Sequence, residues 1–353
     1  MKDQLYTEAL DVLKNLIRIP SFSKEESLSA DLIQQYLEAK GQKVNRHINN
    51  VWVVHPDYQA GRSTLLLNSH HDTVKPTSSW TEEPFLPTEK DGKLIGLGSN
   101  DAGGPLVSLM ATFLYFAQKP SLKWNLVYAA TAEEEISGFH GIESIKSHIG
   151  RIDLAIVGEP SKMELAVAEK GLLVIDCKAP GRPGHAAREE GENAIYNALS
   201  DIEWIRNYKF PKVSAVLGPT KMSVTMIKAG YQHNLVPDVC DFVIDVRTNE
   251  YYSNEETLGI IRQNLKSETS ARSLRLNSSF IPDDHPLVKI AKDLKIHCYG
   301  SPTSSDQAVM PWTSVKIGPG DSARSHTANE YIYPSEIKHG IDLYIEILEK
   351  LEF

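Results

Sequence analysis

The chain has 353 residues, of which 41% are apolar and 24% are charged, and its formal net charge is -9. This is the composition of a globular protein, and the length favours two domains over a single compact core. No basic block offsets the negative charge, which argues against nucleic acid or an anionic membrane as a partner. A small molecule is therefore the expected partner.

Neither a disulfide framework nor a targeting segment is visible in the sequence. The three cysteines, Cys177, Cys240 and Cys298, are far apart and odd in number, and they form no CxxC metal motif. The N-terminus opens into an amphipathic pattern without the apolar core of a signal peptide, and no apolar run approaches the roughly 18 residues of a membrane span. These features predict a cytoplasmic protein without a membrane partner.

Helices and strands alternate through the first half of the chain. A first helix is predicted to end near Pro20, and Ser23 to Glu26 resembles a capping box that opens a second helix, closed by Gly41. The apolar patterns then predict strands at 51–54, 64–67, 126–130, 154–157 and 165–168, and helices at 105–117 and 142–149. This alternation is typical of an α/β domain with a mixed, largely parallel sheet.

The pattern changes near Gly171. Four strands at 172–178, 222–228, 239–247 and 273–278, with two helices at 193–206 and 254–265, predict an α+β layer domain. After a linker at 282–286, the chain returns to a short strand at 315–317 and a long helix at 334–351. We therefore expect a catalytic domain of residues 1–170 and 284–353, interrupted by an inserted domain of residues 171–283.

Acidic side chains follow the apolar strand at 126–130. Its end leads into Glu133, Glu134 and Glu135, although glutamate is a poor strand former and is rarely buried without a partner. Ligands of α/β sheets bind beyond the carboxyl ends of the strands, so these acids are candidate functional groups. A solvated helix N-terminus, where acids complement the helix dipole, is the alternative interpretation.

Metal-type donors also follow the neighbouring strands. His70 and Asp72 lie two apart at a strand end, so His70 can bind a metal while Asp72 accepts its other ring N–H; a loop histidine beside a surface aspartate is the alternative. Asp101 stands where a dinucleotide loop would have its third glycine, and its charge would repel a pyrophosphate. We expect the preceding glycines to present this carboxylate, with a helix N-cap as the alternative.

Two further donors complete the pattern. Glu159 follows the strand at 154–157 and is held extended by the proline after it, and His326 lies in a polar turn near the C-terminus. Two histidines with several carboxylates are too many ligands for one zinc ion. They suit a pair of divalent ions, because each ion takes four or so donors.

Taken in order, these motifs resemble those of the dinuclear zinc exopeptidases and deacylases. That family includes acetylornithine deacetylase, succinyl-diaminopimelate desuccinylase, aminoacylase and bacterial glutamate carboxypeptidase. The resemblance covers nearly the whole chain and rests on His-x-Asp, Gly-x-Gly-x-x-Asp, Glu-Glu, Gly-Glu-Pro, Gly-x-x-Gly-His and a late histidine. Length and motif spacing are closest to the acetylornithine deacetylase branch.

The resemblance implies a role for each of these donors. His70 would bind one zinc ion and His326 the other, and Asp101 would bridge both. Glu135 and Glu159 would complete the two sites, and Asp72 would orient His70 by accepting the N–H of its other ring nitrogen. Glu134 resembles the general base, which deprotonates the water between the metals and returns the proton to the leaving amine. Cobalt or manganese would suit these nitrogen and oxygen donors as well as zinc does.

The inserted domain resembles the lid of the family, which often also forms the dimer. His185, in Gly184-His185-Ala186, matches the histidine that stabilises the oxyanion, in relatives often from the partner subunit. Asn234 and Arg247 match positions that bind the substrate carboxylate. A salt bridge at a strand end is the alternative for Arg247. The resemblance thus implies a homodimer through the lid domain.

The sequence departs from the family pattern at two positions. A small residue usually stands where this chain has His71, but strand alternation puts only one of the two histidines on the metal face, and the spacing to Asp72 favours His70. Relatives often have a lysine two residues after Asp101, where this chain has Gly103. The second departure removes no metal ligand.

The resulting prediction is a metal-dependent amidohydrolase that acts on an N-acylated amino acid. N-acetylornithine deacetylation in arginine biosynthesis is the first expectation. Succinylated substrates, such as succinyl-diaminopimelate or an acylated ornithine or citrulline, need a further cation, for which Arg182, Arg188 and Arg324 are candidates. A di- or tripeptidase is another alternative, and a non-catalytic binding protein would be expected to have lost the base or a ligand.

Overall fold

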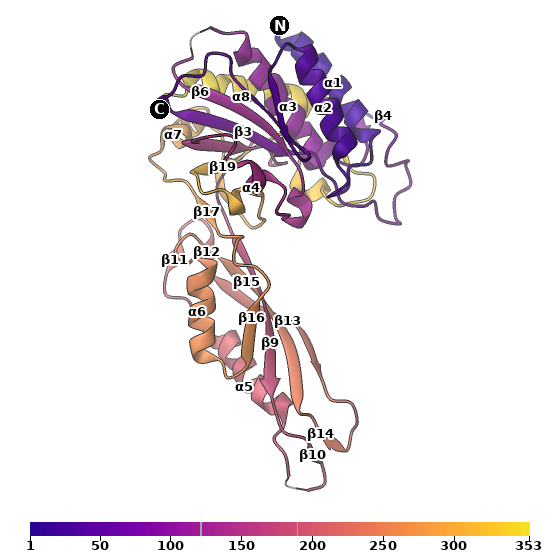
Figure 1. The fold of residues 1–353 in the computed structure, drawn as a ribbon, viewed down its shortest axis with the longest axis vertical. Helices are drawn as coiled ribbons and strands as arrows, with labels where there is room; N and C mark the ends of the chain where they lie inside the picture. Colours follow the sequence, from indigo (N-terminus) through magenta and orange to yellow (C-terminus); the bar gives the residue numbers. More distant parts are fainter. Residues whose placement is uncertain (121, 189) are drawn as a thin grey trace. The chain divides into compact units, whose positions relative to one another are not determined.

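The computed structural model describes residues 1–120, 122–188 and 190–353. The chain forms two compact units (Figure 1): unit 1 contains residues 1–167, 281–299 and 305–353, and unit 2 contains residues 168–280 and 300–304. The predicted insertion, residues 171–283, corresponds to most of unit 2. Within the described ranges, no helix is long and apolar enough to cross a membrane.

A mixed sheet forms the centre of unit 1. Its strand order is β1-β2-β6-β3-β7-β19-β8-β17, and β18 also pairs with β8. The pairs β3·β6, β3·β7 and β7·β19 are parallel, whereas β1·β2, β2·β6 and β8·β19 are antiparallel. The strands are β1 (Val44–His47), β2 (Asn50–Val54), β3 (Thr64–His70), β6 (Asn125–Thr131), β7 (Leu154–Val157), β8 (Leu165–Glu169), β17 (Ser279–Phe280), β18 (Cys298–Ser301) and β19 (Ser314–Lys316). The predicted mixed α/β fold is confirmed.

Apolar packing on both faces explains why the central strands read as continuous apolar runs. All seven residues of β3 and of β6 are buried. Leu65 and Leu67 face a large apolar cluster, whereas Leu66 faces a smaller cluster with Ile142 and Ile145. The large cluster includes residues of α1 (Lys2–Ile17), α2 (Ser27–Ala39), α3 (Gly104–Ala117), α7 (Pro286–Asp293) and α8 (Pro334–Lys350), and the smaller one contains α4 (Ile142–Ile145).

Three predicted elements of the sequence differ in the structure. The expected capping box is wrong: α2 begins at Ser27 after Glu26, with no side-chain cap, because the Ser23 hydroxyl instead donates to the buried Asp72 carboxylate at 2.7 Å. The helix expected over 142–149 is limited to the four residues of α4. The strand expected at 273–278 is also wrong, because the fourth strand of unit 2 is β16 (Glu268–Ala271).

An antiparallel sheet with helices on one face forms unit 2. Its strand order is β13 (Lys221–Ala229), β15 (Val239–Thr248), β9 (Gly171–Pro180) and β16. Alternate residues of β9 and β15, such as Ile175 and Ile244, form a core with α5 (Ala194–Asn207) and α6 (Asn254–Asn264). The remaining short pairs are β10 (Gly184–His185) with β14 (Leu235–Val236), and β11 (Val213–Ser214) with β12 (Gly218–Pro219).

A small three-stranded sheet lies beside the loop that carries Asp101. It consists of β20 (Tyr331–Ile332), β5 (Lys93–Ile95) and β4 (Thr88–Lys90), all antiparallel. Because β20 pairs with β5, the segment after His326 runs next to the residues that lead into the Asp101 loop. This pairing brings together two stretches that are far apart in the sequence.

Candidate metal centre

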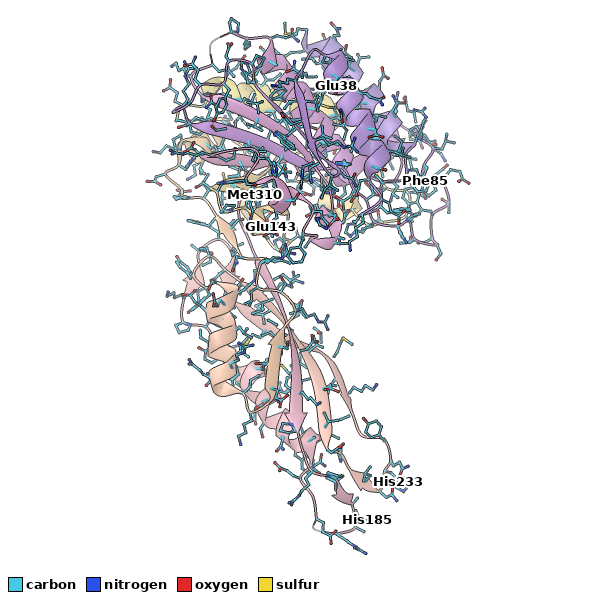
Figure 2. The ribbon with its side chains drawn as sticks, in the orientation of Figure 1. Glu38, Phe85, Glu143, His185, His233 and Met310 are labelled. Atoms are coloured by element: carbon cyan, nitrogen blue, oxygen red, sulfur yellow. The ribbon has the colours of Figure 1, made fainter. Side chains whose placement is uncertain are left out.

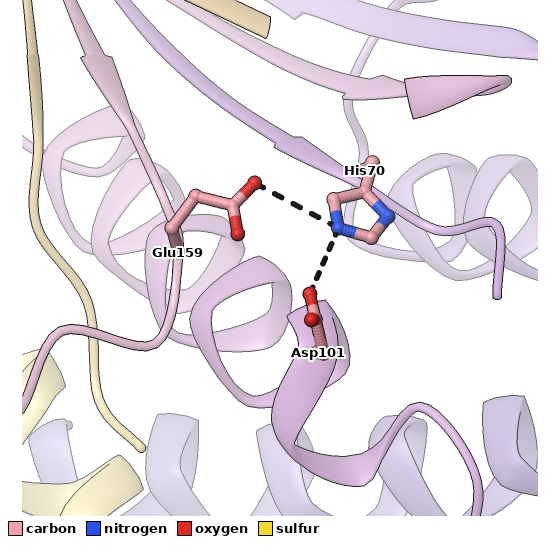
Figure 3. A group of neighbouring side chains, drawn as sticks. All are labelled: His70, Asp101 and Glu159. Atoms are coloured by element: carbon pink, nitrogen blue, oxygen red, sulfur yellow. Dashed lines mark hydrogen bonds and ion pairs between the residues drawn. The ribbon is translucent and has the colours of Figure 1, made fainter. Parts of the chain in front are cut away.

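His70 ends β3 and is 1% exposed. Its Nδ1 lies 3.0 Å from the backbone oxygen of Asp72, which can only accept, so Nδ1 carries the proton and donates it. The opposite nitrogen, Nε2, lies 3.2 Å from Asp101 Oδ1 and 3.7 Å from Glu159 Oε1 (Figure 3). Nε2 is therefore the ring atom directed at the carboxylates, and it is available to a metal.

A second group of donors shares Asp101 with the first. His326 Nε2 lies 2.9 Å from Glu135 Oε2 and 3.7 Å from Asp101 Oδ2. The two oxygens of Asp101 thus face two different histidines. Within the described part of the chain, His70, Asp101 and Glu159 form one group with ligand atoms within 4.8 Å of one another, and Asp101, Glu135 and His326 form another.

Asp72 is a buried carboxylate that contacts both halves of this centre. Its Oδ1 lies 3.3 Å from the Nδ1 atom of His70 and accepts the backbone N–H of Glu134 at 3.1 Å. Its Oδ2 accepts the backbone N–H of Glu135 at 3.2 Å and the hydroxyl of Ser23 at 2.7 Å. The sequence predicted the contact with His70, but the contacts with the turn at 134–135 follow only from the structure.

Three successive glutamates follow β6, and they differ in environment. Glu133 has a φ of 56° and is 5% exposed, and its carboxylate accepts the backbone N–H of His140 at 3.3 Å. A Cβ at Gly138 would lie 2.0 Å from Glu133 Oε2 and 2.6 Å from its Cβ, so only glycine fits there without a shift. Glu134 and Glu135 form a single 3-10 turn whose backbone N–H groups point at Asp72.

The pKa values of two acids of the centre, Glu134 and Asp101, are shifted in opposite directions. Burial raises the pKa of Glu134 well above its usual range, and the Glu159 and Asp306 carboxylates add to this, although His70 opposes it. Burial acts in the same direction on Asp101, but hydrogen bonds with His70 and Ser325 and the charges of His70 and His326 together outweigh it, so the pKa of Asp101 is lowered. An acid with a raised pKa beside an ionised one is the arrangement that proton transfer needs.

The two histidines of the centre have raised pKa values. Burial lowers the pKa of His70, but hydrogen bonds with Asp101 and Asp72 and the charges of Glu134 and Glu159 together outweigh it and raise this pKa well above the usual value. The hydrogen bond with Glu135 raises the pKa of His326 to about 9. Both shifts reflect the negative charge of the carboxylates, which a bound cation would also neutralise.

His71 points away from the carboxylates. Its Nε2 donates to the backbone oxygen of Asn49 at 2.9 Å, and its Nδ1 lies 2.8 Å from the hydroxyl of Ser29. Burial lowers the pKa of His71 to about 4, so the ring is neutral at neutral pH. Of the two adjacent histidines, only His70 is directed at the other metal-type donors.

Two buried acids near the centre had no sequence signal. Glu330 is 2% exposed and accepts backbone N–H groups of Asn100 and Asp101. Asp306 is 5% exposed and accepts the side chains of Asn68 and Thr131 on the same oxygen, each at 2.8 Å. Burial raises the pKa of Asp306 to about 6. Neither residue follows a predicted strand directly, so the strand-end argument could not find them.

The predicted substrate residues belong to unit 2. His185 lies in β10, which pairs with β14, and Figure 2 labels it at the end of that unit. The backbone N–H of Ala186 donates to the backbone oxygen of Asn234 at 3.0 Å, so His185 and Asn234 are close together. Arg247 forms a bidentate pair with Asp245, at 2.8 and 3.1 Å. The salt bridge considered as the alternative for Arg247 is therefore present.

Arg324, one of the candidate cations for a second substrate carboxylate, is already paired with an acid. Its guanidinium donates to both oxygens of Glu336, at 2.7 and 3.1 Å. It also lies over the rings of Tyr331 and Tyr333, at 4.7 and 5.1 Å from their centres. Arg188, by contrast, is exposed and lies 3.9 Å from Glu190.

The donor set fits a pair of divalent cations. Imidazole and carboxylate ligands suit zinc, cobalt or manganese, and one carboxylate shared by two groups is the usual arrangement of a two-ion site. The fold and this centre together define an α/β metallohydrolase with its donors at the carboxyl ends of parallel strands. Comparison with known proteins gives the family.

Residues 66–350 match Peptidase family M20/M25/M40. Succinyl-diaminopimelate desuccinylase of Xylella fastidiosa (strain M12) is 24% identical over 98% of this chain and 99% of its own. The structure of aminopeptidase PepT from Bacillus cereus is similar with a TM-score of 0.77, at 18% identity, covering 99% of this chain and 98% of that one. The Bacillus subtilis YXEP protein, described as a dinuclear metal binding peptidase from the M20 family, has a TM-score of 0.72 at 14% identity, covering 98% of each chain.

The chain belongs to peptidase family M20/M25/M40. It is a metal-dependent amidohydrolase, as the sequence motifs indicated. The family-level prediction is confirmed, but these relatives do not single out acetylornithine deacetylase.

Proposed function

We propose that this enzyme hydrolyses the amide bond of an N-acylated amino acid, with Glu134 as the general base between two metal sites. One observation supports the proposal above all. The Oε2 atom of Glu134 lies 3.8 Å from the Nε2 atom of His70, beside two donor groups that share Asp101. A base in that position can reach a water molecule held at the shared carboxylate.

His70, Asp101 and Glu159 would hold one ion, and Asp101, Glu135 and His326 the other. When bound, such ions polarise a carbonyl oxygen and lower the pKa of water from about 15.7 to near 7. Asp72 fixes the tautomer of His70, because the Nδ1 proton is directed at Asp72 and Nε2 is left as the donor atom. The same carboxylate holds the backbone of Glu134 and Glu135.

Glu134 takes the proton from the attacking water and delivers it to the nitrogen of the leaving amine. Its burial and the nearby carboxylates raise its pKa, which makes it a stronger base than an exposed glutamate and a competent acid afterwards. A base placed in this way typically contributes about 100- to 10,000-fold to the rate. Removing it should therefore lower kcat by about that factor without removing a metal ligand.

The residues of unit 2 are proposed to bind the substrate. His185 is exposed on β10 and has an imidazole that can donate to the carbonyl oxygen as negative charge develops there, from its own or a partner subunit. Asn234 and Arg247 are proposed to bind the substrate carboxylate. Because Arg247 is paired with Asp245, this role requires that the substrate carboxylate join or replace the Asp245 contact.

Two acyl groups are candidates for the substrate. An N-succinylated diamino acid is supported by the name of the Xylella relative, which aligns with nearly the whole chain. N-acetylornithine, which would place the enzyme in arginine biosynthesis in the cytoplasm, is the other candidate, because its acetyl group has no carboxylate and needs no further cation. Of the candidate cations for a succinyl carboxylate, Arg324 is paired with Glu336, whereas Arg188 is exposed.

A homodimer through unit 2 is also proposed. Among the described residues, the strand β13 is at the edge of its sheet, where a partner strand can add. Its Met226 and Ile227 are 63% and 56% exposed, and Tyr196 and Leu199 on α5 are 70% and 51% exposed. Apolar side chains of this size beside an open strand edge are typical of an interface between copies.

The experiment that tests the function measures hydrolysis by the metal-loaded enzyme of N-acetylornithine, N-succinyl-diaminopimelate and a tripeptide. The variant Glu134→Ala should retain its bound metal while kcat falls by about 100- to 10,000-fold. Appreciable residual hydrolysis by that variant would refute the base assignment. Equal rates on all three substrates would refute both acyl-group candidates.

A further inference from the structure

Glu330 is a buried carboxylate on the segment after His326. Its Oε1 accepts the backbone N–H groups of Asn100 at 2.8 Å and of Asp101 at 2.9 Å, and its Oε2 accepts the N–H of Gly98 at 3.2 Å. Its backbone oxygen accepts the N–H of Gly96 at 3.0 Å. A buried carboxylate is costly unless it is hydrogen-bonded, and here the backbone of one loop supplies the donors.

A second contact joins the same loop to the residues before His326. The side chain of Asn100 accepts the backbone N–H of Asp321 at 3.0 Å and donates to the oxygen of Asp321 at 3.0 Å. A Cβ at Gly320, which has a φ of 92°, would lie 2.5 Å from the Asn100 side-chain oxygen, so this approach needs glycine. The Asp101 loop is therefore held on both sides of His326 along the chain.

These contacts give Glu330 a definite relation to the shared ligand. Asp101 must direct Oδ1 at His70 and Oδ2 at His326 for the two donor groups to share it. The N–H of Asp101 itself donates to Glu330, so the carboxylate of Glu330 fixes the backbone from which the Asp101 side chain extends. Among the described residues, the backbone donors to the Glu330 carboxylate all come from 98–101.

We propose that Glu330 is a positioning residue that holds Asp101 in the orientation in which it bridges two metal ions. The proposal rests on the two-ion site proposed above. Without Glu330, the loop at 98–101 has unpaired buried N–H groups and can change its conformation. The Asp101 carboxylate would then face only one of the two donor groups. Loss of such a supporting contact typically lowers metal affinity by roughly 10- to 100-fold.

The variant Glu330→Gln tests this assignment. Glutamine has one acceptor oxygen, so its amide group faces at least one backbone N–H that it cannot accept. Metal-stripped protein is titrated with cobalt(II) ions against a competing chelator, and both the number of ions and their affinities are measured. We expect wild type to bind two ions and Glu330→Gln to bind one of them roughly 10- to 100-fold more weakly.

Asp201 in unit 2 offers a matched control. It is 3% exposed and accepts the backbone N–H groups of Lys266 and Ser267 at 3.1 and 2.8 Å, so Asp201→Asn removes a similar buried contact elsewhere. This control should lose stability but bind both ions as wild type does. If Glu330→Gln does not fold, Asn100→Ala removes the second contact of the loop and should weaken one ion in the same way.

Three results would overturn the assignment. The first is two cobalt ions bound by Glu330→Gln with wild-type affinity, and the second is an equal loss of affinity in Asp201→Asn. Either result leaves the two-ion site intact and removes only the role of Glu330. The third is a wild type that binds fewer than two ions, which would refute the two-ion site of the proposed function and the role of Glu330 with it.

Discussion

Adjacent histidines on opposite faces of one strand end allow a paired experiment, His70→Leu and His71→Leu. Leucine cannot bind a metal or titrate, so the same change is made at two neighbouring buried positions. His70→Leu removes a donor of the His70, Asp101 and Glu159 group and should lose one of two bound ions. His71→Leu should keep both ions, because both ring nitrogens of His71 contact Asn49 and Ser29 instead.

His71→Leu should also lower the stability of the protein, measured without bound metal, and the size of this loss follows from the contacts of His71. His71→Leu leaves the Asn49 oxygen without its partner, which costs about 1–3 kcal/mol, whereas the Ser29 hydroxyl can still donate to the backbone oxygen of Glu26 at 2.9 Å. Asn49 is only partly buried, so water can satisfy its oxygen in part. A loss of roughly 1–3 kcal/mol in the free energy of unfolding is therefore expected near neutral pH.

The difference in unfolding free energy between wild type and His71→Leu should also depend on pH. Burial holds the pKa of His71 at about 4 in the folded protein, below its value of about 6.5 in an unfolded chain. The unfolded state therefore binds the extra proton first, and the stability that neutral His71 contributes is complete above about pH 6.5 and is lost as the pH falls toward 4. Between about pH 7.5 and about pH 5.5 this loss is about 1.3 kcal/mol in the wild type and absent in His71→Leu.

Urea unfolding of both proteins, followed by circular dichroism with chelator present, measures the difference. The gap in unfolding free energy between wild type and His71→Leu should narrow by about 1.3 kcal/mol over that pH range. A gap that stays constant or widens would refute the assignment of a buried neutral His71. Loss of a metal ion in His71→Leu, with both ions retained in His70→Leu, would show that the wrong histidine was assigned as the ligand.

Three further predictions concern other parts of the chain. Gly138→Ala should displace Glu133 and lower kcat roughly 10-fold or more. Gly259→Ala is the control, because a Cβ there meets nothing within 4 Å, and equal kcat values for the two variants would contradict the prediction. Asp306→Ala should destabilise the protein by about 2–4 kcal/mol, and Asp306→Asn by less, because asparagine keeps an acceptor oxygen. Urea unfolding of the two variants measures this difference in unfolding free energy. Ile227→Lys should convert a dimer to a monomer in light scattering, and an unchanged mass would remove β13 from the interface.

Strand-end reasoning could find the residues that leave the sheet directly. His70 is the last residue of β3, Glu159 follows β7, and Glu134 and Glu135 follow β6 within a few residues. Parallel strands bring their carboxyl ends to one edge, so donors at those ends meet whatever the details of the loops. Period-two alternation also separated His70 from His71, because neighbouring side chains of a strand point to opposite faces.

Buried acids whose hydrogen-bond partners are distant in the sequence could not be found in this way. Glu330 precedes β20 and Asp306 begins a 3-10 turn, and an acid in either place is common on protein surfaces. Their burial depends on which N–H groups or side chains the rest of the fold directs at them. That information is tertiary, and no spacing in the sequence carries it.

The error at the second helix shows how tertiary contacts override a local pattern. Ser23 and Glu26 have the spacing of a capping box, which would pair each side chain with the other's backbone. In the structure the Ser23 hydroxyl donates to Asp72, and the Glu26 carboxylate accepts the N–H of Glu133 at 3.2 Å and the side chain of Asn49 at 2.8 Å. Both side chains therefore contact residues that hold the turn containing Glu134, and for this reason they do not form the local helix cap.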